Sequence, residues 1–548
     1  MTVPGSSRRA ARARIALCFL TAVALATALA AAVPASSADP DVAAPPDTAL
    51  IELFVSSFEE GLRRLDRAWF DAMWTTYTTG RQGRLSSCEA ARATYLRNPL
   101  VLDEVSSWVG RIDDQRLGRR VELLHRVLLQ ARVEGIEAVY ALEDSLTRLQ
   151  ISHRARLEGR QVEDAELARI LRVEPDRARR RAAFIARAGI GEVLGEGLAG
   201  LFEIRTRTAR DLGEKGFYEL RLSLDEVVPS ELTALMETLE RETREPYAAY
   251  ASDLAGNLHA PVEAWDLLYD PRGVLAELEP FFPADSLIPR TRRTFAGLGF
   301  DLASLAIHWD LEPREGKSEH AFCFPVDPPG DVRVLANARP GIDAAATLLH
   351  ETGHAVHATA LEDASHLLRD GPSGAFNEGI GELFGQLAYD PEWMAGVAGV
   401  PADLAARYLE IRRTRRLFTV RWYLALLDFE REAYARPGQD LSALYWAMLH
   451  RYLLVPEHPE IPVWAQVPHL LSHPVYVQNY LLADLVAAQM RADLTKRHGG
   501  LVGRRDTEGD LRERLFRHGA LYAGQDLILR ATGARLDPAF FARELLDD

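Results

Sequence analysis

Cysteine is scarce in this chain of 548 residues, which contains only three. Frameworks of paired cysteines hold many small secreted domains together, and three cysteines are too few to build one. Cys18 lies in an apolar segment near the N-terminus, so the remainder of the chain can form at most one disulfide, between Cys88 and Cys323. The fold must therefore depend on a hydrophobic core.

Alternating strand patterns are also rare, and the chain contains no internal repeat or low-complexity segment. Apolar residues instead recur at three- and four-residue steps, for example over 117–149 and 232–255, which is typical of amphipathic helices. We therefore predict an all-α fold that is mostly helical, with one small β-hairpin or short sheet. The length exceeds that of a usual single core, so we expect two helical lobes around a deep cleft.

Positive charge is in deficit, since the formal net charge is −15. Four of the arginines, Arg8, Arg9, Arg12 and Arg14, lie in the first fourteen residues, and without them the charge is about −19. A strongly acidic protein is repelled by the phosphate backbone. We therefore exclude nucleic acid as a partner.

The N-terminus has the pattern of a secretory signal peptide. The four arginines precede an apolar run over 15–33, and small residues follow as far as Ala38. We predict a signal peptide over 1–38, a short linker over 39–47 and one domain over 48–548. The mature chain would then be secreted or periplasmic and free of the membrane. An uncleaved membrane anchor is the alternative, because the apolar run is long enough to span a bilayer.

An H-E-x-x-H motif at 350–354 is the most specific chemical pattern in the chain. Two histidines four residues apart project from one face of a helix, so His350 and His354 can bind the same zinc ion. Glu351 then points at the water held by the metal, where it can act as a base. The surrounding alanine and leucine residues favour a helix, which Asp343 can cap.

Two histidines do not complete a catalytic zinc site, which needs a third protein ligand and one open position. Glu378 and Glu382 share one face of the next predicted helix, after a loop at 371–374. Two carboxylates on a buried face need a cation or hydrogen-bond donors, although a solvated acidic face is the alternative. We predict one Zn²⁺ per chain, with Glu378 as its third ligand. Glu382 would hold a ligand histidine by its other ring nitrogen.

These residues resemble two known peptidase families. The 28-residue separation of His350 and Glu378, with Phe-x-Glu-x-Ile-Gly around the latter, resembles the angiotensin-converting-enzyme family of zinc peptidyl-dipeptidases. Segment 348–357 is also similar to the thimet oligopeptidase family. The resemblance implies a helical zinc peptidase with a deep cleft that acts on oligopeptides. It would either release dipeptides from C-termini or cut short peptides internally.

The resemblance continues upstream of the motif, where segment 314–323 is similar to both families. It implies that His320 and Ala321 contact the substrate. The residues on either side of the turn at 327–331 are typical of a β-hairpin close to the active site. A free strand edge there could bind an extended peptide, and a purely structural hairpin is the alternative.

Further catalytic groups are implied downstream of the metal ligands. By resemblance, His469 binds the substrate backbone and Tyr480 donates its phenol proton to the oxyanion, while Glu351 carries the proton of the attacking water. His473 is a rival to His469, and we expect Tyr476, one helical turn before Tyr480, to face the cleft and contact the substrate as well. Each of these four side chains could instead be buried and hydrogen bonded to the backbone.

Two positions depart from the converting-enzyme pattern. That family has a lysine that holds the terminal carboxylate of the substrate, and this chain has Val467 there. The family also has an arginine linked to chloride binding, and this chain has Asn479. A zinc metallopeptidase that acts as a monomer is our main hypothesis. A non-catalytic helical protein that keeps zinc for structure is the rival, but it would not need Glu351.

Overall fold

The structure is a computed structural model that describes residues 47–269 and 273–546. The predicted signal peptide over 1–38 lies outside these residues, as does the predicted linker except Asp47, which caps the first described helix. No helix in these two ranges is both long enough and apolar enough to cross a membrane.

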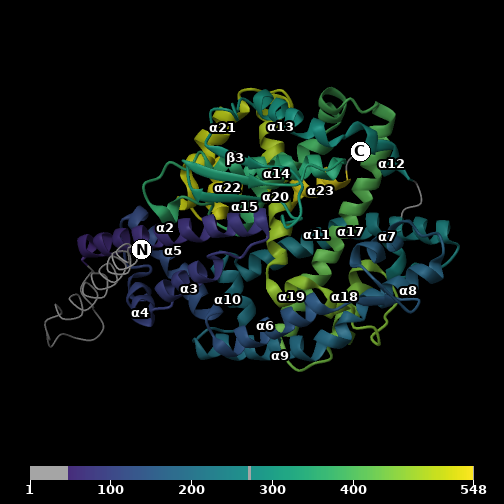
Figure 1. Cartoon of the computed structure of the whole chain (residues 1–548), viewed down its shortest axis with the longest axis horizontal. Helices are drawn as coiled ribbons and strands as arrows, with labels where there is room; N and C mark the ends of the chain where they lie inside the picture. Colours follow the sequence, from purple (N-terminus) through teal and green to yellow (C-terminus); the bar gives the residue numbers. More distant parts are fainter. Residues whose placement is uncertain (1–46, 270–272, 547–548) are drawn as a thin grey trace, which may run out of the picture.

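Helices form most of the fold, as predicted (Figure 1). The helices of the first half of the chain are α2 (Thr48–Thr79), α3 (Leu85–Leu96), α4 (Pro99–Trp108), α5 (Gln115–Glu134), α6 (Glu137–Ser152), α7 (Asp164–Val173), α8 (Arg177–Ala188), α9 (Ile190–Asp211), α10 (Phe217–Leu224), α11 (Pro229–Leu258), α12 (Val274–Leu278) and α13 (Ala284–Leu298). Those of the second half are α14 (Ile342–Ala358), α15 (Gly374–Gly385), α16 (Pro391–Trp393), α17 (Ala402–Ala435), α18 (Leu441–Leu453), α19 (Pro468–Ser472), α20 (Val477–His498), α21 (Thr507–Arg514), α22 (Gly524–Thr532) and α23 (Pro538–Leu546).

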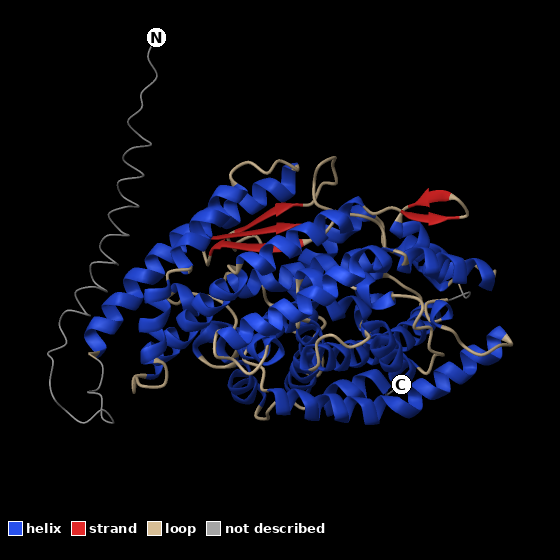
Figure 2. Cartoon of the chain, turned by 90° about the horizontal axis from the view of Figure 1, so that it is seen from below, coloured by secondary structure: helices blue, strands red, loops and turns tan. Residues whose placement is uncertain are grey.

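The strands are few and short (Figure 2). The predicted hairpin is present as β4 (Phe322–Asp327) and β5 (Asp331–Leu335), which pair antiparallel. A third strand, β3 (Ile307–Asp310), pairs parallel with β5 and leaves β4 at one edge of the sheet. A separate hairpin joins β1 (Ala155–Leu157) to β2 (Arg160–Val162). These last three strands were not predicted, because three or four residues are too few to show a clear alternation.

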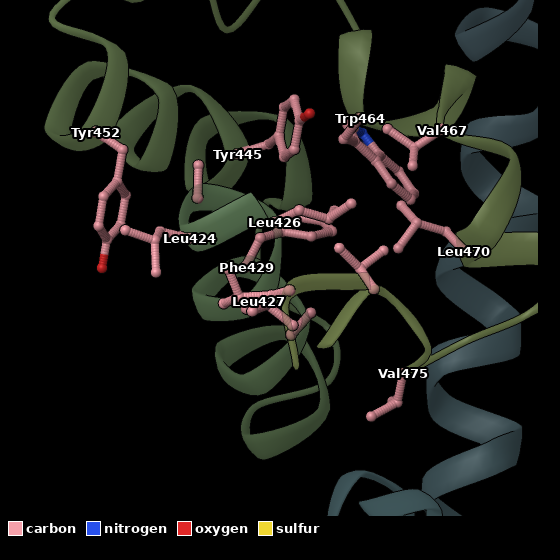
Figure 3. Packing of buried hydrophobic residues seen from close by; sticks show 14 of the residues in the cluster. Leu424, Leu426, Leu427, Phe429, Tyr445, Tyr452, Trp464, Val467, Leu470 and Val475 are labelled. Carbon is pink, nitrogen blue, oxygen red and sulfur yellow. The ribbon is translucent and has the colours of Figure 1, made fainter. Parts of the chain in front are cut away.

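Two large hydrophobic cores organise the described residues, and the helix with the H-E-x-x-H motif belongs to the second. The first core joins α9, α11, α18 and the second half of α17, with Leu424, Phe429, Tyr445, Trp464 and Leu470 among its residues (Figure 3). The second core joins the three-stranded sheet to α13, α14 and α15. The long helices α17 and α20 supply residues to both cores. They therefore connect the two lobes in one unit.

Helix α2 covers one face of the three-stranded sheet. Its residues Phe70, Trp74 and Tyr77 pack with Phe322 and Phe324 of β4, and the rings of Tyr77 and Phe322 stack 5.1 Å apart. These aromatic contacts fix the edge strand against the N-terminal helix. The position of β4 therefore depends on residues almost 250 positions earlier in the chain.

A buried arginine holds the segment that carries His469. Arg205 of α9 is 1% exposed and donates hydrogen bonds to the carbonyl oxygens of Leu470 and Leu471, at 2.8 and 2.7 Å. Its guanidinium also lies 2.7 Å from the carboxylate of Glu143 on α6. The short helix α19 is therefore fixed to α6 and α9 by one side chain.

Replacing this arginine should destabilise the protein. Arg205→Ala leaves two buried carbonyl oxygens and a carboxylate without their donor, so we expect the free energy of unfolding to fall by about 3 kcal/mol. Urea denaturation followed by circular dichroism would measure this loss. Arg207→Ala on the exposed face of the same helix is the matched control and should change stability little. Equal unfolding midpoints for the two variants would contradict this role of Arg205.

Candidate metal centre

Helix α14 carries the H-E-x-x-H motif, as predicted. The helix begins at Ile342, and the residue before it, Gly341, has a φ of 121° and donates its N–H to the carbonyl oxygen of Phe282 at 2.9 Å. The expectation that Asp343 caps the helix was therefore wrong, because the helix begins one residue before Asp343. Asp343 lies in the first turn and accepts a hydrogen bond from the hydroxyl of Tyr389.

Helix α15 follows and lies very close to α14. Its N-cap, Ser373, accepts a hydrogen bond from the backbone N–H of Phe376. A Cβ atom at Gly381 would lie 2.5 Å from Nε2 of His350 and 2.7 Å from Nε2 of His354. Real Cβ atoms do not approach other atoms so closely. The absence of a side chain at Gly381 therefore allows both imidazoles to sit against α15.

His350, His354 and Glu378 come together at this junction, and their ligating atoms all lie within 4.8 Å of one another. The two Nε2 atoms are 3.0 Å apart, and Nε2 of His350 lies 3.5 Å from Glu378. Zinc bound tetrahedrally with bonds of about 2.05 Å would separate neighbouring ligand atoms by about 3.3 Å. Two imidazoles and one carboxylate are also a donor set that zinc prefers. The residues therefore fit a zinc ion.

Glu382 lies beside the other nitrogen of His350. Its Oε1 is 3.5 Å from Nδ1 of His350, and its Oε2 accepts a hydrogen bond from Gln386 at 2.6 Å. The amide oxygen of Gln386 in turn accepts a hydrogen bond from Arg412 of α17. Burial opposes the charge of Glu382, but the hydrogen bond and charge of His350 outweigh it and lower the pKa of Glu382 to about 2.

The pKa values of His350 and His354 shift in opposite directions. Burial alone would lower the pKa of His350, but hydrogen bonds to Glu378 and Glu382 raise it to about 10. Burial and the neighbouring His350 hold the pKa of His354 well below its usual value. The two carboxylates therefore favour a positive charge at His350.

Glu351 is 9% exposed and packs toward the sheet. Burial raises its pKa to about 7, against the positive charge of His350 and a backbone hydrogen bond from Cys323 of β4. A carboxyl group with a pKa near neutrality can both accept and release a proton under ordinary conditions. This is the property required of a base that later acts as an acid.

Four aromatic and imidazole side chains from α19, the first turn of α20 and the segment between them form a cluster next to Glu378. The hydroxyl of Tyr480 lies 3.4 Å from Nε2 of His469, and Tyr476 packs edge-on to Tyr480 at 5.4 Å. His473 packs against Tyr476 at 5.9 Å. Burial, together with the negative charge of Glu378, raises the pKa of both tyrosines. The structure therefore brings these four predicted residues to one side of the metal centre.

His320 and Ala321 immediately precede the edge strand β4. The His320 ring is exposed and 6.4 Å from that of Phe322, and within 47–269 and 273–546 no hydrogen bond joins His320 to the metal-binding residues. Ala321 is half-buried. These two residues are thus placed near the strand that reaches Glu351, but not in the metal centre itself.

The residues that depart from the converting-enzyme pattern have other roles here. Val467 is buried in the first core near Leu470 (Figure 3). Asn479 is fully buried, and its side-chain N–H donates to Asp225 at 3.0 Å. Both side chains therefore support the fold.

Sequence reasoning missed two residues of the centre. Gln386 directly follows α15 and is four residues after Glu382, so an i, i+4 pattern of polar residues could have revealed it. The backbone of Cys323 carries no signal in the sequence, because its place beside Glu351 depends on how β4 packs against α14.

Comparisons with known proteins agree with this description of the fold. No protein family model matches the chain. Among solved structures, it is similar to the M32 carboxypeptidase from Deinococcus radiodurans R1, with a TM-score of 0.65 and 17% sequence identity. The match covers 91% of this chain and 98% of that chain. At this identity the similarity establishes the fold, and it favours neither of the two families that the motifs resemble.

Proposed function

We propose that this protein is a zinc-dependent peptidase that removes residues from the C-termini of short peptides. The observation that carries this proposal is the meeting of His350, His354 and Glu378 around a space that suits zinc, with Glu351 on the same helix. A protein that kept zinc only for structure would need no buried carboxyl group at this position. The carboxypeptidase named above, which has the same fold, adds support for action at C-termini.

Zinc, when bound, would polarise the scissile carbonyl and stabilise the negative charge that develops on its oxygen. Glu351 would take the proton of the attacking water and deliver it to the leaving amine. Tyr480 would donate a hydrogen bond to the oxyanion, and its raised pKa keeps the phenol protonated at neutral pH. His469 lies within 3.4 Å of that phenol and would orient it or bind the substrate backbone.

The substrate would lie along the edge strand β4. This strand pairs with β5 on one side, and in the described part of the chain no other strand pairs with it. A peptide bound by main-chain hydrogen bonds at this edge would pass close to Glu351, whose carboxylate already reaches the backbone of Cys323. His320 and Ala321, which precede the strand, would then contact the peptide.

The number of residues released is the finer part of this proposal. The peptidyl-dipeptidase resemblance implies dipeptides, whereas the named neighbour is a carboxypeptidase. Val467 is buried where the dipeptidase family has a lysine, so that contact with the terminal carboxylate is absent here. We therefore favour release of single residues over release of dipeptides. Internal cleavage of short peptides is the alternative.

We also propose that the enzyme works outside the cytoplasm. This rests on the basic and apolar pattern of residues 1–38, and cleavage after Ala38 would be visible as the N-terminus of the mature protein.

Removing the base should abolish hydrolysis without removing the metal. Glu351→Gln keeps the shape of the side chain but cannot accept a proton, so we expect turnover of a quenched peptide to fall by about 10³-fold or more. Zinc content, measured by atomic absorption, should stay near one ion per chain. Normal turnover by this variant would show that the roles assigned above are wrong.

Replacing Gly381 by a larger residue should weaken metal binding. Gly381→Ala places a methyl group against both imidazoles, so we expect zinc affinity to fall by about 100-fold while the helices remain formed. Competition with a fluorescent chelator would measure it. Gly509→Ala is the matched control, since a Cβ at that helical glycine meets nothing within 4 Å. If both variants bound zinc equally, the close approach of α15 would not matter for the site.

Blocking the substrate C-terminus should separate the two modes of cleavage. We expect a peptide with a free C-terminal carboxylate to be cut at least about tenfold faster than its amidated copy, because the amidated peptide lacks the terminal charge that the enzyme would recognise. Mass spectrometry of the products would give the number of residues released. Equal rates with cleavage in the middle of both peptides would favour an endopeptidase instead.

A further inference from the structure

A large basic pocket lies between α17, α20, α23 and the segment that follows α15. Its volume is about 1160 Å³. Its walls contain six basic side chains and three acidic ones: Arg412, Arg413, Arg416, Arg491, Lys496 and Arg543 against Asp390, Glu410 and Glu544. The chain as a whole has a net charge of −15, so a cavity with excess positive charge is a marked local reversal. Such a cavity concentrates anions.

One of these cations, Arg412, has no carboxylate partner among the described residues. The guanidinium of Arg412 lies 3.7 Å over the ring of Tyr389 and donates to the amide oxygen of Gln386. Within residues 47–269 and 273–546 no carboxylate lies at ion-pair distance from it. Burial and the nearby charges of Arg416 and Arg491 lower the pKa of Arg412. An anion in the pocket would relieve this repulsion.

Arg491 offers a further donor that nothing accepts. Two of its nitrogens bind the carboxylate of Glu544, but Nη1 is buried and has no hydrogen-bond partner in the described part of the chain. A buried donor without an acceptor costs free energy, and such atoms often mark the position of an ion or ligand.

Two more cations line the pocket on its exposed side. Lys496 makes no ion pair with any described residue, and Arg543 is hydrogen bonded only to the carbonyl oxygen of Ala539 while its guanidinium covers the ring of Phe540. Both retain donors for a ligand. Lys496 lies on α20 and Arg543 on α23, and both residues are exposed.

We propose that this pocket binds a free oxyanion with at least two negative charges, of which inorganic phosphate is the simplest. Planar guanidinium groups pair with two oxygens of a phosphate at once, and such charge-assisted hydrogen bonds are the strong ones. The volume exceeds that of phosphate alone, so the natural ligand has room for a small organic body that carries the anionic groups. The pocket is separate from the peptide-binding strand β4.

The pocket is connected to the metal centre by a chain of side chains. Arg412 binds Gln386, Gln386 binds Glu382, and Glu382 lies against Nδ1 of His350. A smaller cavity of about 170 Å³ shares Arg412 and Gln386 with the pocket and is also lined by Glu378 and Tyr480. An anion that draws Arg412 away from Gln386 would therefore change the hydrogen bonding of a metal ligand. This consequence rests on the proposed function, whereas the binding itself does not.

Calorimetric titration with inorganic phosphate would test the binding, on both metal-free and zinc-loaded protein, with the ionic strength held constant by chloride. We expect saturable binding of one phosphate per chain. Lys496→Ala/Arg543→Ala should weaken it by about tenfold, since two charged contacts are lost from positions that do not support the fold. Lys215→Ala/Arg81→Ala, which removes two exposed cations outside the pocket, should leave the affinity unchanged.

Three results would overturn the proposal. The first is an absence of saturable binding, and the second is an equal loss of affinity in both double variants. The third is inhibition by phosphate that is strictly competitive with peptide, because it would place the anion in the substrate site. The peptidase proposal is judged separately by Glu351→Gln, which should bind phosphate normally while it fails to cleave peptides. If that variant instead cleaved peptides normally and bound phosphate, the anion-binding proposal would be supported and the catalytic role of Glu351 would be wrong.

Discussion

The close contact between α14 and α15 is the constraint on which the metal centre depends. Glycines at 353, 381 and 385 let the two helices approach until side chains of one meet the backbone of the other. Only at this separation can a carboxylate from α15 reach the imidazoles of α14. A larger residue at these positions would push the helices apart, and the same ligand residues would then surround too large a space. The close approach of the two backbones therefore sets the spacing of the three candidate ligands.

Charge balance explains how so polar a centre can be buried. Two carboxylates, Glu378 and Glu382, flank His350, and a third, Glu351, lies on the next residue. A positive charge at this position, such as that of a divalent cation, would offset the three carboxylates. Gln386 and Arg412 continue the network outward to a pocket rich in arginine. The acidic metal centre and the basic pocket are therefore two ends of one set of hydrogen bonds.

The residues beyond the ligands are placed by the two cores. Arg205 anchors the carbonyl oxygens of α19, so that His469 faces Tyr480 at the first turn of α20. Helix α2 holds the edge strand through Tyr77 and Phe322, so that the backbone of Cys323 meets Glu351. The position of His469 therefore depends on a buried cation, and that of Cys323 depends on aromatic packing. Both contacts join residues that are more than two hundred positions apart in the sequence.

The sequence alone determined the helical class, the hairpin at 322–335 and the two helices that carry His350, His354 and Glu378, because periodicity and i, i+4 spacing are local properties of the chain. It did not determine β3, whose partner is more than twenty residues away, or the start of α14, which depends on the contact of Gly341 with Phe282. Nor could it assign Gln386 or Cys323, or reveal that arginines from α17, α20 and α23 share one pocket. These features arise from packing between distant segments, and only the tertiary structure decides which distant segments meet.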